Sequence, residues 1–422
     1  MLRPKTFGET IGPILLANVL FGVGCIGHVR KRGAKRSVKI VYFLVAISAL
    51  ACTIFYQYRL SAMYMLPPKV DLNLVFLTVW FSCTCIVVLL LIVATKFGDE
   101  NVHDLIETIE NVDEQMATIG LPKQYSSQYK YQMINFVLFL VYVFLYVTIT
   151  WISDFKPNIS IQAHVFLSVS LNLVSILSLM GHLSFCVWIR YVRTKLYQLN
   201  CLLAEMIDVL DAPKSERLRE MIGGCPIRRR SGRHELRGNV QIIAKVKKYH
   251  LDWIKIARRV NRFYGIHVLA STSISFMTIL YVLFILNCLL LRQSSADASL
   301  LEICSGLTVL SLDCVRVIHL HSKCRKTSDE ARKTGYLLCL LYDSSTGEKF
   351  RAEVQNFTQQ VLENPLVFTI CGLVDFDRSF LANLFGSICT YVFVILQLRT
   401  QNMIGRRLSE ATTSANVTLT DA

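Results

Sequence analysis

Long blocks of apolar residues alternate along the chain with polar segments that carry most of its charge. About 20 predominantly apolar residues are enough to cross a bilayer as a helix, so blocks of this length predict transmembrane helices. Seven such spans are predicted: Ile40–Tyr56, Leu72–Thr95, Met133–Ile152, Val165–Ile189, His267–Leu291, Leu300–Val317 and Phe380–Leu398. The fold class that follows is an all-α membrane protein.

The composition supports the same class. Hydrophobic residues make up 53% of the 422 residues, above the usual share of about 45–50%. Charged residues make up 18%, below the share of about 25% in soluble domains. A chain of this length with an ordinary composition would form two or three soluble domains. The gathering of apolar residues into long blocks excludes that organisation.

An earlier apolar stretch, Ile11–Gly27, is poor material for a regular span, because it contains Pro13, Asn18 and several glycines. We interpret it as a re-entrant or interfacial segment. A full span, which would place the N-terminal tail outside, is the alternative. Arg30-Lys31-Arg32 follows, and no small-residue cleavage pattern precedes it, which argues against a cleaved signal peptide.

The basic residues predict the orientation, because Lys and Arg accumulate in cytoplasmic loops. With the N-terminus inside, 36 Lys and Arg residues fall in the inner segments and 7 in the outer ones. We therefore predict an inverted topology, with a cytoplasmic N-terminus and an outer C-terminus. The net charge of +15 then serves orientation and attraction to the anionic inner leaflet of the bilayer, and no nucleic-acid partner is predicted.

The predicted organisation has seven parts. Tyr191–Leu210, Val240–Val260 and Leu337–Val361 carry apolar residues at helical spacing, so we expect helical extensions that form a cytoplasmic anchor region. The parts are 1–37, a cytoplasmic tail with the re-entrant or interfacial segment; 38–189, helices one to four; 190–262, a basic cytoplasmic loop; 263–317, helices five and six; 318–378, a cytoplasmic linker; 379–398, helix seven; and 399–422, an extracellular tail.

The last predicted span keeps its polar and small residues on one helical face. These residues recur at steps of four and three, and we call them the polar stripe: Asn383, Ser387, Thr390, Val394 and Gln397. Leu384, Phe385, Ile388, Val392, Ile395 and Leu396 occupy the opposite face. An unpaired amide or hydroxyl in hydrocarbon is costly, so the stripe faces either another helix or water. The spacing alone leaves both interpretations open.

The same segment resembles the final helix of insect gustatory receptors. Thr390-Tyr391, five apolar residues and Gln397 are similar to the signature Thr-Tyr-(five apolar)-Gln-Phe of that family. The stretches Phe368–Leu373 and Asp377–Leu381 are similar to the segment that leads into it. Leu398 stands where the family usually has Phe. The resemblance covers about Phe368–Leu398. It leaves open whether the chain falls in the fructose-receptor-like branch of the gustatory receptor family.

This resemblance implies a ligand-gated, non-selective cation channel in the cell membrane of sensory neurons. Four copies, as a homotetramer or a heterotetramer with other gustatory receptors, surround one pore that opens on binding a small tastant such as a sugar or a bitter compound. By resemblance, Gln397 rings the outer end of the pore, and Leu398 closes it by excluding water. By helical spacing, Val394 and Thr390 line the pore below, and Tyr391 lies beside the stripe at a subunit contact.

We expect the tastant site in the outer half of the helix bundle. Candidate ligand-binding residues of polar or aromatic character at that depth are Trp80, Tyr146, Trp151, Asn172, Tyr281, Asn287 and Glu302. Trp and Tyr are also common anchors at the membrane interface, so each aromatic residue has a structural alternative. Glu302 stands out because an ionisable residue inside a span is costly, unless it lies at the headgroups.

Other functional classes receive less support. No phosphate loop or Gly-x-Ser-x-Gly motif is present in the sequence, and the spacing His319-x-His321-x-x-Cys324 lacks a fourth metal ligand, so no enzyme activity, metal or cofactor is predicted. A G-protein-coupled receptor and an accessory subunit of a heteromeric receptor channel are the alternative functions.

Three polar residues within or near the spans, His182, Asp313 and Arg316, are interpreted as structural, with Asp313 and Arg316 neutralising each other. Asn158 and Asn416 are predicted glycosylation sites on the outer side, and Cys288 and Cys304 are a candidate disulfide across a short outer loop.

Overall fold

Long helices make up most of the structure. The computed structural model describes residues 4–20, 82, 86, 99–154, 161–210, 239–292, 300–342, 347–377, 379–397 and 400–401. Predicted spans three to six fall in α5 (Tyr125–Asp154), α6 (Ile161–Leu210), α9 (Val240–Arg292) and α10 (Leu300–Leu341). The seventh falls in a C-terminal helix, Ser379–Gln397. These helices are confirmed, whereas predicted spans one and two lie outside the described residues, apart from Ser82 and Ile86, which are helical.

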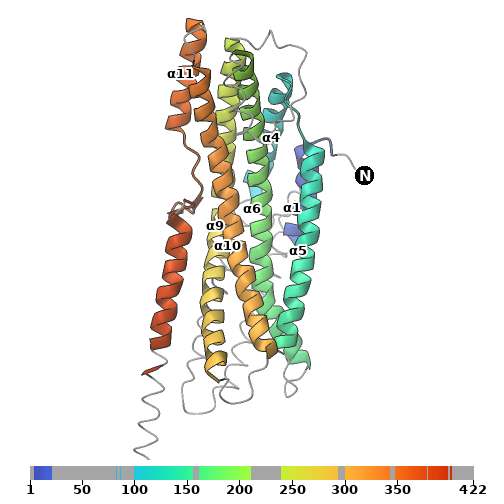
Figure 1. Ribbon diagram of the computed structural model, residues 1–422. Coiled ribbons are helices and arrows are strands. Elements are labelled where there is room, and N and C mark those ends of the chain that lie inside the picture. The colour runs from blue at the N-terminus through green and yellow to red at the C-terminus, as the bar shows by residue number, and fades with distance from the viewer. Residues whose placement is uncertain are drawn as a thin grey trace, which may run out of the picture.

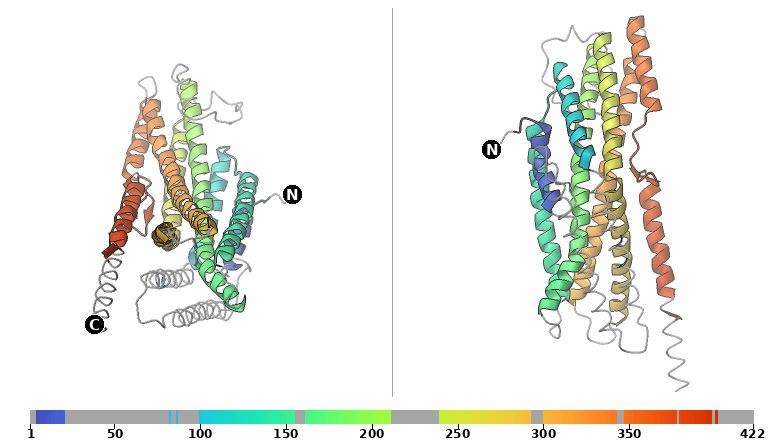
Figure 2. Two further views of the ribbon diagram at one scale, coloured as in Figure 1. Left: turned by 60° about the horizontal axis from the view of Figure 1, so that its bottom comes forward. Right: turned by 180° about the vertical axis from the view of Figure 1, so that it is seen from behind.

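The four long helices run side by side (Figure 1). α6, α9 and α10 pack against one another, and α5 packs on α6. Three shorter helices, α1 (Phe7–Leu20), α4 (Asp99–Thr118) and α11 (Glu348–Glu363), lie against this bundle. The C-terminal helix stands at its edge, as both views in Figure 2 show. Five helices among the described residues are long and apolar enough to cross a membrane: those within α5, α6, α9 and α10, and the C-terminal helix.

α1 forms a regular helix through Pro13 in the stretch that the sequence marked as poor helical material. Phe7 and Ile11 are fully buried. Polar contacts add to this packing, because the Gly8 amide donates to Glu110 Oε1 at 2.9 Å and the Ser184 hydroxyl donates to Asn18 Oδ1 at 2.8 Å. Tertiary contacts with α4 and α6 therefore outweigh the weak local propensity. The re-entrant or interfacial placement of Ile11–Gly27 stays a prediction.

The helical extensions are confirmed for the first two predicted stretches, since α6 continues without a break to Leu210 and α9 begins at Val240. The apolar positions that predicted them lie in the core. Those at most 1% exposed are Leu196, Leu199, Leu203, Met206, Ile243, Val246, Trp253, Ile254 and Ala257. Burying one such side chain contributes about 1.5–3 kcal/mol, so this end of the bundle is well stabilised within one chain.

The third stretch, Leu337–Val361, contains two helices. α10 ends at Leu341 and α11 begins at Glu348, after an N-cap at Gly347 that supplies no side-chain hydrogen bond. α11 buries Phe350, Val354 and Phe357 against α9 and α10. The helical spacing was read correctly, but the reversal of chain direction between the two helices was not predicted.

A buried ion pair ties α4 to α6. Lys195 Nζ lies 2.9 Å from Asp113 Oδ1, with the two side chains 1% and 0% exposed. The Tyr191 hydroxyl donates to the same carboxylate, and Lys195 also donates to the carbonyl oxygens of Pro122 and Lys123 at 3.3 and 3.2 Å. Burial raises the pKa of the Asp113 carboxyl, and the Lys195 ammonium opposes that rise.

A second buried polar contact fixes how α6 and α10 align. Asn200 Nδ2 donates to the backbone and side-chain oxygens of Glu330 at 2.9 and 2.8 Å. The Thr334 hydroxyl donates to Asn200 Oδ1 at 2.7 Å. A one-residue slip of α10 along α6 would leave these buried groups unpaired, at about 1–3 kcal/mol each. The contact therefore holds the two helices in one register.

Candidate functional site

A short hairpin leads into the C-terminal helix. β1 (Thr369–Ile370) pairs antiparallel with β2 (Val374–Asp375) across a turn in which Cys371 and Gly372 have φ of 50° and 75°. Glycine adopts this left-handed backbone without strain, which explains Gly372 in the turn. Phe368, just before the hairpin, is 1% exposed and meets Phe185 of α6 edge to face at 6.3 Å between ring centroids. The stretch Phe368–Leu373, on which part of the family resemblance depends, therefore anchors the segment before the C-terminal helix to the helix bundle.

Asp377 caps the C-terminal helix. Its Oδ1 accepts hydrogen bonds from the backbone amides of Ser379 and Phe380, both at 3.0 Å. The hydrogen bond from the Ser379 hydroxyl is the main cause of a lowered pKa of this exposed carboxyl. The geometry shows capping for Asp377.

The C-terminal helix presents its two faces to different surroundings. All five residues of the polar stripe are exposed. On the opposite face, Ile388 is 3% and Ile395 is 8% exposed, because this face packs on the bundle. Ser387 and Thr390 donate their hydroxyls to the carbonyl oxygens of residues 383 and 386, at 2.8 and 3.0 Å. The apolar face thus holds the helix to its own chain, and the polar stripe is turned away from that chain.

Two neighbours of the stripe differ in what the structure describes. Tyr391, which was expected at a subunit contact, is 53% exposed and meets Phe276 of α9 edge to face at 6.0 Å between ring centroids. It therefore contacts its own chain as well as presenting surface outward. Leu398, the predicted gate, lies outside the described residues.

A small cavity of about 10 Å³, which is roughly the space of one water molecule, lies between α5, α6 and α10. Tyr142 and Tyr146 stack on each other at its α5 wall, with ring centroids 6.1 Å apart and planes 6° from parallel. Its lining residues are Tyr142, Val143, Tyr146, Ser175, Ile176, Leu179, Asp313 and Arg316. Aromatic and aliphatic walls with a few polar groups are typical of small-molecule sites.

The polar side of this cavity is an ion pair inside the helix bundle. Arg316 lies 2.5 Å from Asp313 Oδ1, and its guanidinium also donates to the Ser275 hydroxyl of α9. The predicted neutralisation of Asp313 by Arg316 is confirmed. The sequence interpretation nevertheless missed that both residues line the cavity. The available signal was that ionisable residues within a membrane span mark functional sites more often than structural ones.

Of the predicted ligand-binding residues that the structure describes, Tyr146 lines this cavity and the others do not. Asn172 is buried nearby between α5 and α6, where the Thr150 hydroxyl donates to its Oδ1 at 3.2 Å. Trp151 lies near the end of α5, and Trp80 lies outside the described residues. Tyr281 and Asn287 are on α9, and Glu302 is in the first turn of α10, where a carboxylate is favoured by the helix dipole.

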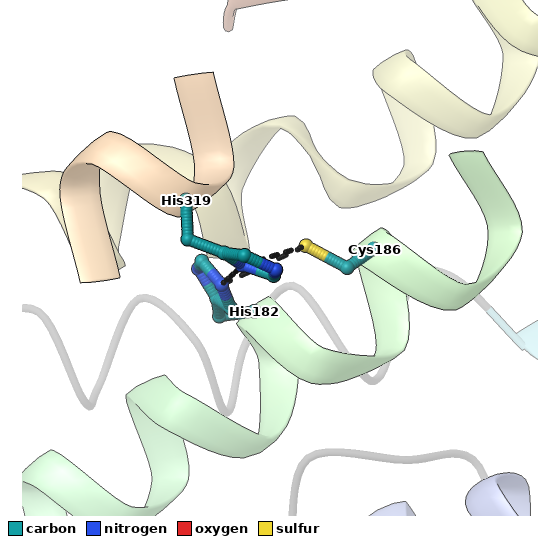
Figure 3. Close-up of side chains that lie close together, drawn as sticks. All are labelled: His182, Cys186 and His319. Atoms are coloured by element: carbon teal, nitrogen blue, oxygen red, sulfur yellow. Dashed lines mark hydrogen bonds between the residues drawn. The ribbon is translucent and has the colours of Figure 1, made fainter. Parts of the chain in front are cut away.

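Three side chains with metal-binding atoms meet between α6 and α10, and we call them the His–Cys cluster: His182, Cys186 and His319 (Figure 3). The trio suggested by sequence spacing does not assemble, because the His321 ring contacts the Asp377 carbonyl at 2.6 Å instead.

The candidate disulfide between Cys288 and Cys304 is wrong, since Cys304 is a free thiol. Asn158 and Asn416 lie outside the described residues, so their glycosylation stays a prediction.

Comparisons with known proteins agree with this architecture. A protein-family model described as 7tm chemosensory receptor matches residues 11–402. Proteins named gustatory receptor 28b and gustatory receptor 58b, both of Drosophila melanogaster, are 22% and 26% identical over 161 and 156 residues. The matched part is 37% of this chain in both cases, and it spans only 34% and 38% of those relatives.

The fold has a counterpart among solved structures. The insect olfactory receptor OR5 from Machilis hrabei matches with a TM-score of 0.61 at 15% sequence identity, covering 92% of this chain and 97% of that chain. The structure of the same receptor in complex with eugenol matches with a TM-score of 0.57. At this identity the likeness shows a shared fold.

Proposed function

Because the chain belongs to the 7tm chemosensory receptor family, we propose that it is a gustatory receptor that works as a ligand-gated, non-selective cation channel in the cell membrane. Membership of this family points to a receptor and away from an enzyme. The channel, its tastant and its location in sensory neurons are the parts that we propose.

The observation that carries the proposal is the outward-facing polar stripe of the C-terminal helix. One copy of this helix encloses nothing, whereas four copies around an axis bring four stripes together and surround a water-filled path. Gln397 then supplies a ring of uncharged amides, which bind hydrated cations weakly and suit a pore of low selectivity. Leu398 follows as an apolar constriction, and Val394 and Thr390 continue the lining.

The residues that line the small cavity between α5, α6 and α10 form the proposed tastant site, and their side chains have to move apart to admit a ligand. Its stacked tyrosines offer aromatic faces, and the Asp313–Arg316 pair offers hydrogen-bonding groups that are already desolvated. This combination suits a small molecule with hydroxyl groups and an apolar or ring-shaped body, such as a sugar or a bitter compound. The structure of OR5 in complex with eugenol shows that a receptor of this fold binds a small molecule.

Cysteine accessibility tests the pore. In a Cys389→Ala background, single cysteines are placed at Ser387, Thr390 and Val394 on the stripe, and at Ile388 and Ile395 on the buried face. Receptor-expressing cells are treated with a water-soluble thiol reagent during activation by sugars and bitter compounds. Because thiol reactivity follows access, we expect stripe cysteines to lose current at least roughly tenfold faster than buried-face cysteines.

Equal rates on the two faces would contradict the pore and leave the stripe as a packing contact between helices. Ligand-evoked signalling that persists without a membrane current would favour the G-protein-coupled alternative. Current that needs a second gustatory receptor and does not change when the stripe cysteines are modified would favour the accessory-subunit alternative.

The orientation is tested independently by epitope tags at the two ends. With 36 of the assigned Lys and Arg residues on the inner side and 7 on the outer side, an N-terminal tag should stain only after permeabilisation, and a C-terminal tag should stain on intact cells. Surface staining of the N-terminal tag would refute the inverted topology.

A further inference from the structure

We propose that the His–Cys cluster binds a Zn²⁺ ion that links α6 to α10. Nothing in the proposed channel mechanism uses these three side chains, and the inference does not depend on that mechanism. His182 and Cys186 are one turn apart on the same face of α6, and His319 approaches from α10, as Figure 3 shows. His182 and Cys186 are buried, whereas His319 is exposed.

The distances between the three ligand atoms match those around one tetrahedral ion. His182 Nε2 lies 3.2 Å from His319 Nδ1, and Cys186 Sγ lies 3.6 Å from His182 Nε2 and 4.0 Å from His319 Nδ1. With Zn–N of about 2.0 Å and Zn–S of about 2.3 Å, a tetrahedral Zn²⁺ separates two nitrogens by about 3.3 Å and a nitrogen from a sulfur by about 3.6 Å. Only the distance from Cys186 Sγ to His319 Nδ1 has to shorten, from 4.0 Å to about 3.6 Å.

The chemistry of the ligands suits the same ion. Two imidazoles and one thiolate form a mixed nitrogen and sulfur set that Zn²⁺ prefers, and the exposed side at His319 leaves the fourth position to water. On binding, the Cys186 thiol releases its proton to solvent and the sulfur forms the bond to zinc, with no change of oxidation state. Each imidazole binds through the nitrogen that faces the cluster and carries its proton on the other nitrogen.

The surroundings set the expected strength. Arg316 and Lys323 flank His319 on α10, but Arg316 is paired with Asp313, and Lys323 lies over the Tyr131 ring at 5.8 Å from its centroid. His182 Nδ1 is buried without a hydrogen-bond partner among the described residues. A group that accepts a hydrogen bond from the second nitrogen of a metal-binding histidine typically changes metal affinity by about 10–100-fold. Because His182 lacks such a group among the described residues, we expect weaker zinc binding than at a site that has one.

Zinc stoichiometry tests the proposal in the purified full-length chain. The protein is reduced, stripped of metal by a chelator, loaded with Zn²⁺ and freed of excess ion, and zinc per chain is measured by mass spectrometry. Cys186→Ser and His319→Gln should each lower the stoichiometry by about one ion relative to the wild type. Cys314→Ser on α10 and His103→Gln on α4, whose side chains lie outside the cluster, should leave it unchanged.

A Co²⁺ spectrum gives a second readout that needs no variant to fold. Co²⁺ in a tetrahedral site with a thiolate ligand produces intense visible absorption and a thiolate-to-metal charge-transfer band. We expect both in the wild-type protein, and we expect Zn²⁺ to displace them. A wild type without the charge-transfer band, or equal zinc stoichiometry in the wild type and in both cluster variants, would overturn the proposal.

Discussion

Lys195→Met should be among the most destabilising single substitutions in the chain. It leaves the Asp113 carboxylate, whose side chain is fully buried, without its ammonium partner. Breaking a buried ion pair from one side costs about 3–5 kcal/mol. A loss of this size exceeds a third of the stability of many domains, so we expect a sharp fall in the yield of folded receptor and in its thermal midpoint. Size-exclusion profiles of detergent-solubilised protein after heating measure both.

The matched control is Lys255→Met on α9, where the lysine is exposed and little change is expected. The double variant Asp113→Leu/Lys195→Met should recover most of the loss, because replacing both partners with apolar residues is often neutral. Tyr191 then still donates to the Lys123 carbonyl at 3.3 Å. If the double variant loses as much as the two single variants together, the two side chains do not act as a pair.

The largest effect on ligand response is expected at the stacked tyrosines of the cavity. Tyr142→Ala and Tyr146→Ala each remove an aromatic wall from the proposed tastant site. Removing an aromatic side chain at the centre of a binding site commonly costs about 2 kcal/mol, which is about thirtyfold in affinity. Dose-response curves for the compound that activates the wild type most strongly, chosen from a panel of sugars and bitter compounds that includes eugenol, should shift by this factor.

Phe144→Ala is the matched control for this shift, because Phe144 lies on α5 between the two tyrosines and is 70% exposed on the outer face of the helix. We expect its dose-response curve to match the wild type at equal surface expression. Equal shifts in all three variants would mean that α5 is merely perturbed. Unchanged curves for both tyrosine variants would place the tastant site elsewhere.

The sequence predicted helices well because the bilayer leaves few options. A chain that crosses hydrocarbon must form all of its backbone hydrogen bonds internally, so each long apolar block becomes a helix. Predicted spans three to seven are helices for this reason. The extensions were predicted for a similar reason: Leu196, Leu199 and Leu203 recur at helical spacing and have no other way to be buried together. Helical periodicity is a local property, so it can be read from neighbouring residues.

The candidate sites were harder to predict because they depend on contacts between distant parts of the chain. His182 contacts His319, 137 residues away, whereas the spacing in the sequence grouped His319 with His321 and Cys324. Asp313 and Arg316 were paired correctly from their spacing, but their position at a cavity depends on how α10 faces α5. The face of the polar stripe was readable, whereas its exposure on the folded chain was not.

The way the C-terminal helix is attached has a mechanical consequence. Its start is fixed by the Asp377 cap, by the His321–Asp377 contact and by the stacking of Phe380 on the His321 ring. Farther along this helix, Ile388 and Ile395 are the only buried side chains among residues 381–397. The helix is about 28 Å long, so a tilt of about 10° around this fixed start moves its far end by about 5 Å. The start acts as a pivot, and Gln397, at the opposite end of the lever, moves farthest for the smallest change in packing.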